Sequence, residues 1–281
     1  MEKTRTLVTG GTGKTGRRVV DGLRALGVPV RAASRSGDTR FDWADPGGWD
    51  AALDGADAVY IVPLDGAPTT RPFVERAVRA GVRRLVLLSA RGVATPGYFA
   101  DDDPVARTHR DGEQAVRESG LDWTILRPGW FADNFSEGLF RPGVLGGELA
   151  LPAGDGAAAW IDARDIADVA VAALTGEGHG GRVYELSGPR PLTVDGALAE
   201  IARAGGPRAR YVPVAAEDFV AAAAAQGVPP EEATAWAAAI GSIRRGLEAA
   251  PTEGVRRALG RPARDFADYA AAAQAAGAWR D

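Results

Sequence analysis

A run of glycines near the N-terminus constrains the fold of this chain more than any other feature. The apolar residues 6–9 lead directly into this run, and an amphipathic segment follows it. This order predicts a strand, a tight turn and a helix. The members of the run are Gly10, Gly11, Thr12, Gly13, Lys14, Thr15 and Gly16.

A steric reason explains the glycine at each of these positions. A side chain at Gly10 or Gly11 would obstruct the turn, and one at Gly13 would keep the backbone away from a phosphate. A side chain at Gly16 would push the helix away from the strand. We therefore expect a helix N-terminus whose N–H groups bind a pyrophosphate.

A P-loop is the rival interpretation of the same run, because Gly13, Lys14 and Thr15 match the last residues of that motif. A P-loop also requires an earlier glycine at the position where this chain has Val8. The spacing therefore favours a dinucleotide-binding turn.

The residues after the second expected strand indicate which dinucleotide binds. NAD-binding proteins usually place an acidic residue about twenty residues past the glycines. This chain has Ser34, Arg35 and a further serine instead. A guanidinium beside hydroxyl groups suits a 2′-phosphate, so we predict NADP(H) as the cofactor. Arg31 and Arg40 are alternatives to Arg35 for this role, and a solvated Arg35 is the other interpretation.

The rest of the chain alternates strands and helices, which predicts a parallel sheet covered on both faces. The expected strands are 6–9, 28–33, 57–62, 84–89, 122–126 and 182–186. The expected helices are 69–80, 104–119, 161–174, 195–204, 216–226, 230–249 and 266–276.

These elements predict an α/β fold, a Rossmann-like doubly wound parallel sheet with a smaller, mostly helical C-terminal lobe. We expect an NADP-binding core at residues 1–135 and a mixed segment at 136–190 that partly returns to the core. Residues 191–281 are expected to form a helical substrate-binding lobe.

Ligands of an open parallel sheet bind beyond the carboxyl ends of its strands, so residues just after the expected strands form the candidate site. The residues expected to contact the cofactor there are Pro63, Leu64, Ser89 and Pro128, and Asp42 and Trp43, farther past the second strand, are expected to flank the adenine. Those expected to contact the substrate are Tyr98, Trp130, Phe131 and Asn134. Aromatic residues just after a strand also commonly belong to the core, and an asparagine there also serves local hydrogen bonding.

The composition excludes several classes of function. The 281 residues include no cysteine and two histidines, and the formal net charge is −4. A chain without cysteine forms no disulfide and has no thiolate nucleophile or iron–sulfur ligand, and two histidines argue against a zinc site, so we expect no metal. Three aspartates from Asp101 on are interpreted as a solvated loop or a helix cap.

Interleaved charges and the lack of a long apolar run argue against a nucleic-acid or membrane partner. We expect a cytoplasmic protein with a small-molecule substrate, and the sequence leaves a homodimer open.

Three segments resemble the NmrA-like branch of the atypical short-chain dehydrogenases/reductases. They are LVTGGTGKTGRRV at the N-terminus, LVLLSA at 85–90 and HRDGEQAVRESGLDWTILRPGWFADNF at 109–135. The last segment is similar to NADPH-dependent quinone reductases and to ergot-type alkaloid reductases of that branch. The resemblance implies hydride transfer to a quinone, an enone or a cyclic imine. It also implies that Pro63 and Ser89 line the nicotinamide ribose.

The chain departs from the wider superfamily at the proton donor. Standard members use a tyrosine and a nearby lysine, but the lysines of this chain are Lys3 and Lys14, so no such pair forms. In some related aromatic-alcohol reductases a lysine occupies the slot that is His109 here, and in members similar to quinone reductases that slot is a histidine. The resemblance therefore implies His109 as the catalytic proton donor, and a packed histidine without a role is the alternative.

Two other functions stay open at this point. One is a non-enzymatic regulator that senses the dinucleotide, the kind of protein that gives the branch its name. The other is an epimerase or dehydratase of nucleotide sugars, which would need the missing tyrosine–lysine pair.

Overall fold

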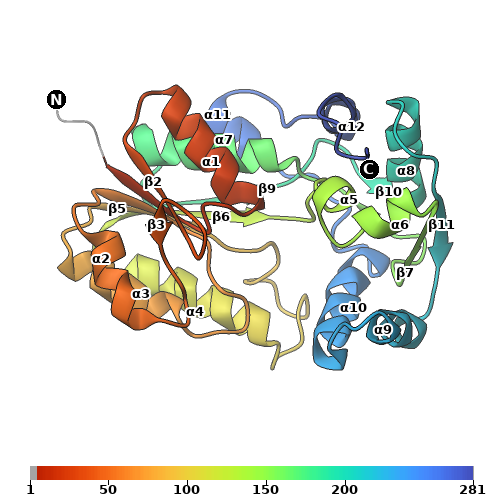
Figure 1. The fold of residues 1–281 in the computed structure, drawn as a ribbon, viewed down its shortest axis with the longest axis horizontal. Helices are drawn as coiled ribbons and strands as arrows, with labels where there is room; N and C mark the ends of the chain where they lie inside the picture. The colour runs from red at the N-terminus through yellow and green to blue at the C-terminus, as the bar shows by residue number, and fades with distance from the viewer. Residues whose placement is uncertain (1–4, 281) are drawn as a thin grey trace. The chain divides into compact units, whose positions relative to one another are not determined.

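The computed structural model describes residues 5–280, and the chain divides into two compact units (Figure 1). Unit 1 consists of the residues up to 128 together with 163–186 and 253–262. Unit 2 consists of 129–162, 187–252 and the residues from 263 on. The chain crosses between the units after residues 128, 162, 186, 252 and 262. The expected domains 1–135, 136–190 and 191–281 stay predictions.

Unit 1 is built on a parallel sheet of seven strands in the order β3-β2-β1-β4-β5-β6-β9. Its strands are β1 (Thr6–Thr9), β2 (Val30–Ser34), β3 (Thr39–Arg40), β4 (Ala58–Ile61), β5 (Arg84–Leu88), β6 (Asp122–Pro128) and β9 (Arg182–Leu186). Its helices are α1 (Lys14–Ala25), α2 (Trp49–Leu53), α3 (Thr70–Arg79), α4 (Pro104–Glu118), α7 (Ala163–Thr175) and α11 (Gly254–Leu259), with a 3-10 turn at Pro46–Gly48. This architecture confirms the predicted doubly wound fold.

The helices of unit 1 cover both faces of the sheet. Helices α1, α7 and α11 pack on one face, and α2, α3 and α4 on the other (Figure 1). Strands β1 and β4 are buried along their whole length because both faces of the sheet are covered. The strand order changes direction between β1 and β4, which in this type of sheet is where ligands bind.

Local signals in the sequence set the ends of helix α4. The side chain of Asp103 caps the helix by accepting a hydrogen bond from Ala106 N at 2.8 Å, and Pro104 takes the first helical position. Gly120 follows the helix with φ of +73°, a backbone conformation that favours glycine. The predicted helix cap is therefore confirmed at Asp103.

Unit 2 combines short helices with two small sheets. The helices are α5 (Asn134–Glu137), α6 (Arg141–Leu145), α8 (Val194–Arg203), α9 (Ala216–Ala225), α10 (Pro230–Arg244) and α12 (Phe266–Ala275). The strands are β7 (Glu148–Leu151), β8 (Ala157–Ala158), β10 (Leu192–Thr193) and β11 (Arg210–Pro213), paired as β7 with β11 and β8 with β10. The sequence did not reveal these strands, because each has at most four residues.

Helix α10 is shorter than expected. It ends at Arg244, whereas the alanine-rich pattern predicted a helix up to residue 249. Gly246 has φ of +73°, so the chain turns there instead of continuing as a helix. Within the part of the chain that the structure describes, no helix combines the length and apolar character needed to cross a membrane.

Candidate functional site

The turn between β1 and α1 is built so that only glycine fits at several positions. Gly10 has φ of +61°. A Cβ atom at Gly11 would lie 2.8 Å from the Cα of Ala32, and one at Gly16 would overlap the carbonyl oxygen of Gly10. The turn therefore packs directly against β2 and against its own first residue. The crowding at Gly16 arises within the turn, which is a more local cause than the displaced helix that we expected.

The N-terminus of α1 fits a pyrophosphate. The helix begins at Lys14 after the N-cap residue Gly13, which has no side chain to cap the first N–H groups. Thr12 and Gly13 are exposed at the tip of the turn, while Thr15 is buried. The exposed backbone and the positive end of the helix dipole both suit an anion. The residues present therefore fit the predicted dinucleotide.

The arginines near the end of β2 have different surroundings. Arg31 donates from its guanidinium to the carbonyl oxygen of Asp54 at 2.6 Å, so it is already engaged. Arg35 and Arg40 are exposed. The hydroxyl oxygen of Ser34 accepts a hydrogen bond from a backbone N–H of the following loop at 3.2 Å, which shapes that loop. The assignment of Arg35 to a 2′-phosphate stays a prediction.

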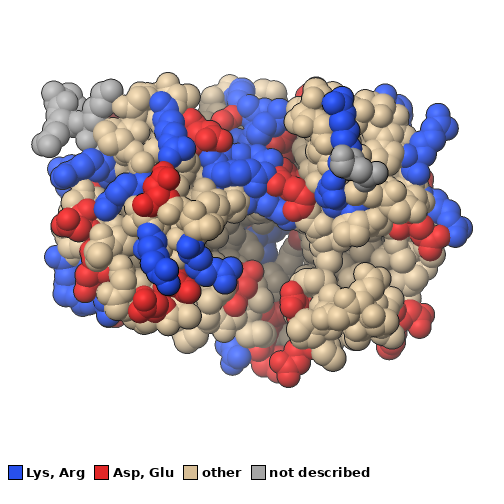
Figure 2. All heavy atoms as spheres, in the orientation of Figure 1, with Lys and Arg blue, Asp and Glu red and all other residues tan. Residues whose placement is uncertain are grey.

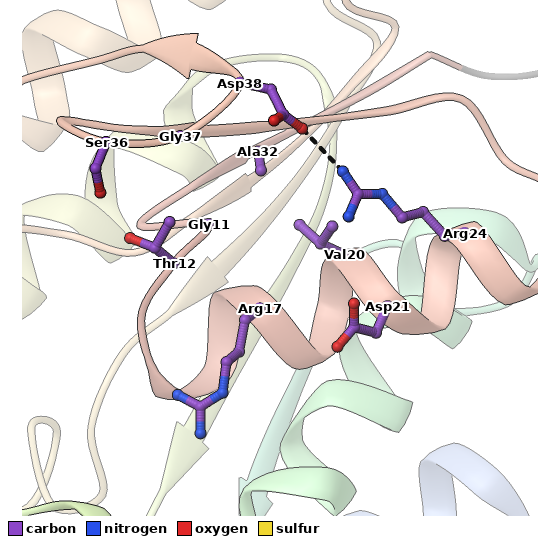
Figure 3. A pocket seen from close by; sticks show the side chains of 10 residues that line it. All are labelled: Gly11, Thr12, Arg17, Val20, Asp21, Arg24, Ala32, Ser36, Gly37 and Asp38. Atoms are coloured by element: carbon purple, nitrogen blue, oxygen red, sulfur yellow. Dashed lines mark hydrogen bonds and ion pairs between the residues drawn. The ribbon is translucent and has the colours of Figure 1, made fainter.

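A pocket of about 330 Å³ lies between α1 and the end of β2 (Figure 3). It is lined by Gly11, Thr12, Arg17, Val20, Asp21, Arg24, Ala32, Ser36, Gly37 and Asp38. Of these residues, Gly11, Thr12 and Ser36 were expected near the cofactor from the sequence, whereas the charged members were not. The signal for two of them was available, because Arg17 and Arg24 are spaced to share one face of a helix.

Asp42 and Trp43 are both held by local hydrogen bonds. A carboxylate oxygen of Asp42 accepts from Ala44 N at 2.9 Å. The indole N–H of Trp43 donates to the carbonyl oxygen of Val62 at 3.1 Å, and its ring meets Phe41 edge-on with centroids 4.9 Å apart. Trp43 keeps part of its surface exposed, so contact with an adenine stays a prediction for this pair.

A buried ionic cluster joins the ends of β5 and β6 to helix α4. The hydroxyl of Ser89 donates to Glu113 Oε1 at 2.7 Å. The guanidinium of Arg127 donates to both oxygens of Glu113, at 2.7 and 2.6 Å. Arg117 adds a contact to the same carboxylate at 2.9 Å, and Arg127 also reaches Glu185 at 3.0 Å. We call these five residues the strand-end cluster.

The strand-end cluster keeps Glu113 ionised. Burial alone would raise the pKa of the Glu113 carboxyl, but hydrogen bonds from Arg127 and Ser89 and the charges of Arg127 and Arg117 outweigh it, so this pKa lies below its usual value. The hydrogen of Ser89 is committed to the carboxylate. Toward a bound ligand, Ser89 is therefore left as a hydrogen-bond acceptor.

His109 lies one turn before Glu113 on α4, and its two ring nitrogens differ in their surroundings. Nε2 lies 3.3 Å from a carboxylate oxygen of Asp65, in the loop after β4. The side chain of His109 is 8% exposed, whereas that of Asp65 is 65% exposed. Among the described residues, Nδ1 has no hydrogen-bond partner and is fully buried. Only the Nε2 edge can therefore exchange a proton with a ligand or with Asp65.

The other residues predicted in unit 1 lie in the loop after β4, at the end of β6 or in the loop before α4. Leu64 is 44% exposed just after β4, next to Pro63. The carbonyl oxygen of Pro128 accepts a hydrogen bond from Arg91 N at 2.9 Å. Tyr98 is buried, and its ring lies where a Cβ of Gly92 would be, so it shapes the loop before α4. Their contacts with ligands stay predictions.

The predicted substrate residues of the segment after β6 lie in unit 2. The indole N–H of Trp130 donates to Ser242 Oγ at 3.2 Å, and its ring stacks on Phe140 with centroids 5.7 Å apart. Phe131 forms an isolated bridge with Ile161, and Asn134 begins α5. Trp130 thus packs against the core of unit 2, which is the alternative that the sequence left open, while part of its surface stays exposed.

Sequence reasoning overlooked three residues that the structure places in the candidate site: Asp65, Glu113 and Arg127. Glu113 follows His109 by one helical turn, a spacing that puts both on one face of a helix. Arg127 is the next-to-last residue of β6, directly before Pro128. Those two signals were readable, whereas nothing local in the sequence pairs Asp65 with His109.

The residues 10–177 match the family model described as NAD(P)H-binding. The chain is also similar to the (4-alkanoyl-5-oxo-2,5-dihydrofuran-3-yl)methyl phosphate reductase of Streptomyces griseus, with 37% identity over 94% of this chain and 96% of that protein. It is 34% identical to the NAD(P)H azoreductase of Xenophilus azovorans, over 96% of this chain and 98% of the relative.

The solved structures agree on the fold. The NADPH-dependent quinone oxidoreductase QOR2 of Escherichia coli, crystallised with NADPH, matches with a TM-score of 0.77 at 24% identity. The match covers 95% of this chain and 99% of that protein. Together these comparisons confirm the predicted resemblance and the predicted class of cofactor.

Proposed function

The chain belongs to the NAD(P)H-binding family, and on that premise we propose that it reduces a conjugated small-molecule acceptor with an electron-poor double bond. The broader prediction of an NAD(P)H-dependent oxidoreductase is confirmed by the family and by relatives that are named as reductases. The acceptor and the residues that act on it are the proposal.

The names of the relatives support an acceptor of this kind. The substrate named for the Streptomyces relative contains a carbon–carbon double bond conjugated to two carbonyl groups, and the Xenophilus relative is named for an azo bond. Each is a flat, polarised double bond that can take up a hydride at one end. Of the acceptors that the sequence left open, an enone with two carbonyl groups is the first to test.

The observation that carries the proposal is the pairing of His109 with Asp65. The imidazole is buried apart from its Nε2 edge, and this edge faces an exposed carboxylate 3.3 Å away. A histidine in such a position can deliver a proton from Nε2, and the carboxylate can hold the imidazole in place and exchange protons with water. Nδ1 takes no part because it is sealed in the protein.

The chemistry then divides between cofactor and protein. NAD(P)H, held by the glycine turn and the N-terminus of α1, would supply the hydride for the electrophilic carbon of the acceptor, and negative charge would then develop on a carbonyl oxygen of the acceptor. His109 gives its Nε2 proton to that oxygen, and water restores the proton through Asp65. Ser89 accepts a hydrogen bond from the ligand, since its own hydrogen is held by Glu113.

The substitution His109→Gln tests this assignment. We expect kcat for an enone or a quinone to fall about a hundredfold, because the oxygen that gains charge loses its proton donor. We expect no change with a cyclic iminium acceptor, because hydride addition neutralises that cation without a proton. The rates are followed by the loss of NADPH absorbance, and NADPH binding is measured separately by titration and should be unchanged.

The other histidine supplies the matched control. His179 lies in unit 1, with Nδ1 2.9 Å from the hydroxyl of Tyr184, and His179→Gln should leave every rate unaltered. Equal rates for the His109 variant and the unmodified protein would remove the proton-donor role. Binding of both redox forms of the cofactor without turnover of enone, quinone or iminium would contradict the reductase and favour the regulator.

A further inference from the structure

The pocket between α1 and the end of β2 lies where the adenosine half of a dinucleotide binds in sheets of this topology. Its walls come from the turn after β1, from one face of α1 and from the loop after β2 (Figure 3). In such sheets the 2′ substituent of the adenosine ribose is recognised just past the second strand. The pocket is therefore placed to distinguish a 2′-hydroxyl from a 2′-phosphate.

The charged side chains that line this pocket balance one another. Arg17 and Arg24 are opposed by Asp21 and Asp38. A phosphate monoester carries about two negative charges near neutral pH, so the arginines attract it and the carboxylates repel it. The preference of the pocket for NADPH or NADH thus depends on whether an arginine can leave its carboxylate partner and bind the 2′-phosphate.

One ion pair connects the two walls of the pocket. Nη2 of Arg24, on α1, lies 2.8 Å from Oδ2 of Asp38, in the loop between β2 and β3 (Figure 3). The two side chains are 54% and 67% exposed. Exposed pairs of this kind contribute little to stability, so the partners can be exchanged at low cost.

The loop is shaped to bring Asp38 back to α1. A Cβ atom at Gly37 would overlap the carbonyl oxygen of Ala32, so only glycine allows the chain to turn so closely against β2. An aspartate near this strand end is also the residue type that accepts a hydrogen bond from the 2′-hydroxyl of NAD. Asp38 comes a few residues later than the usual position, which is why the sequence alone suggested that no acid was present.

We propose that the pair Arg24–Asp38 selects the coenzyme. With NADH, Asp38 accepts the hydrogen bond of the 2′-hydroxyl. With NADPH, Arg24 leaves Asp38 and binds the 2′-phosphate. The inference rests on the use of NAD(P)H in the proposed function and not on the identity of the acceptor. It follows that both coenzymes bind, with dissociation constants within about tenfold of each other. The 2′-phosphate gains Arg24 but is repelled by Asp38, whereas the neutral 2′-hydroxyl gains one hydrogen bond to Asp38.

The test is a titration of NADPH and of NADH, without an acceptor, into the full chain and its variants. Asp38→Asn should lower Kd for NADPH about fivefold and raise Kd for NADH about threefold. Arg24→Gln should raise Kd for NADPH about tenfold and leave that for NADH within about twofold. In the Arg24→Gln background, Asp38→Asn should give a smaller gain for NADPH, because the guanidinium that it would release is gone.

A second surface pair of unit 1 supplies the control. Arg83 lies 2.9 Å from Asp57 at the opposite edge of the sheet, and Arg83→Gln should change neither Kd. Parallel changes for both coenzymes in the Arg24 and Asp38 variants, or no change, would overturn the inference and leave the proposed reaction intact. Conversely, opposite shifts in Kd without turnover of any acceptor would uphold the inference and contradict the proposed reaction.

Discussion

The glycine turn after β1 and the strand-end cluster at β5 and β6 lie at the same edge of one sheet, but their structures depend on opposite properties. The turn depends on the absence of side-chain atoms, since Gly11 and Gly16 have no room for a Cβ. The cluster depends on full satisfaction of buried charges around Glu113. A site of the first kind fails when an atom is added, and one of the second kind fails when a partner is lost.

The largest effect on stability is expected when the cluster loses its main cation. Arg127→Met keeps most of the volume but leaves the buried carboxylate of Glu113 without its bidentate partner. Breaking a buried pair on one side costs about 3–5 kcal/mol, so the free energy of unfolding in urea should fall by about that amount. Arg83→Met, at an arginine whose side chain is 74% exposed, should cost about 1 kcal/mol or less. Similar losses of unfolding free energy in both variants would contradict the claim that the buried pair contributes more to stability than the exposed one.

The turn is expected to fail in binding. Gly16→Ala places a methyl group against the carbonyl oxygen of Gly10, so the turn must open. Its backbone N–H groups then no longer point toward the pyrophosphate. We expect Kd for both NADH and NADPH to rise about a hundredfold, or about 2.7 kcal/mol. Gly241→Ala, in α10 where a Cβ meets no atom within 4 Å, serves as the control and should bind normally. Normal binding by the Gly16 variant would show that the turn is not the phosphate site.

The smallest expected effect is on the pH dependence of stability, which involves the strand-end cluster and not the glycine turn. The pKa of Glu113 is lower in the folded protein than in the unfolded chain, so its contribution to stability is complete above about pH 4.5 and is lost as pH falls through the folded pKa. Glu113→Gln should therefore flatten the loss of unfolding free energy that sets in as the pH falls below about 4.5.

The glycine turn carries no carboxylate, so Gly16→Ala is the control for the pH experiment. It should lower binding but keep the pH slope of stability seen in the unmodified protein. Urea titrations at each pH measure both slopes. A Glu113→Gln protein with an unchanged slope would contradict the role of the buried carboxylate.

Segments with a regular apolar pattern, or with a proline or glycine at an end, were predictable from the sequence. The expected strands 6–9 and 182–186 coincide with β1 and β9, and the helix at Pro104 begins as its proline indicated. The four strands of unit 2 were missed because their short segments lack the apolar run that marks β1, and they pair with residues far away in the sequence. Helix α11 was missed for the same reason, since six residues give no reliable pattern.

The site divides in the same way. The turn was predictable because glycine spacing is local and has a steric cause. The contacts of Asp65 with His109 and of Asp38 with Arg24 were not, since each joins two elements that meet only after the sheet has formed. Glu113 and Arg127 occur in the segment 109–135, whose resemblance to a known family was noted. The sequence alone does not show that this carboxylate and this guanidinium form a buried ion pair.

Figure 2 gives a related view of the surface, where basic and acidic side chains lie interspersed on the face drawn. The pairs Arg24–Asp38 and Arg83–Asp57 are both of this exposed kind. Their surroundings assign them different roles, because Arg24 and Asp38 line the pocket beside α1 and Arg83 and Asp57 are not among its lining residues.

Helix α11 completes unit 1 only late in the chain. It packs on β9 and α7, and a Cβ at Gly254 would overlap the carbonyl oxygen of Glu185. A ribosome must therefore synthesise the chain through α11 before the coenzyme-binding unit can finish folding. A gene fragment that stops after β6 would encode an unfinished sheet, and transplanting this half into another protein would require three separate pieces of sequence.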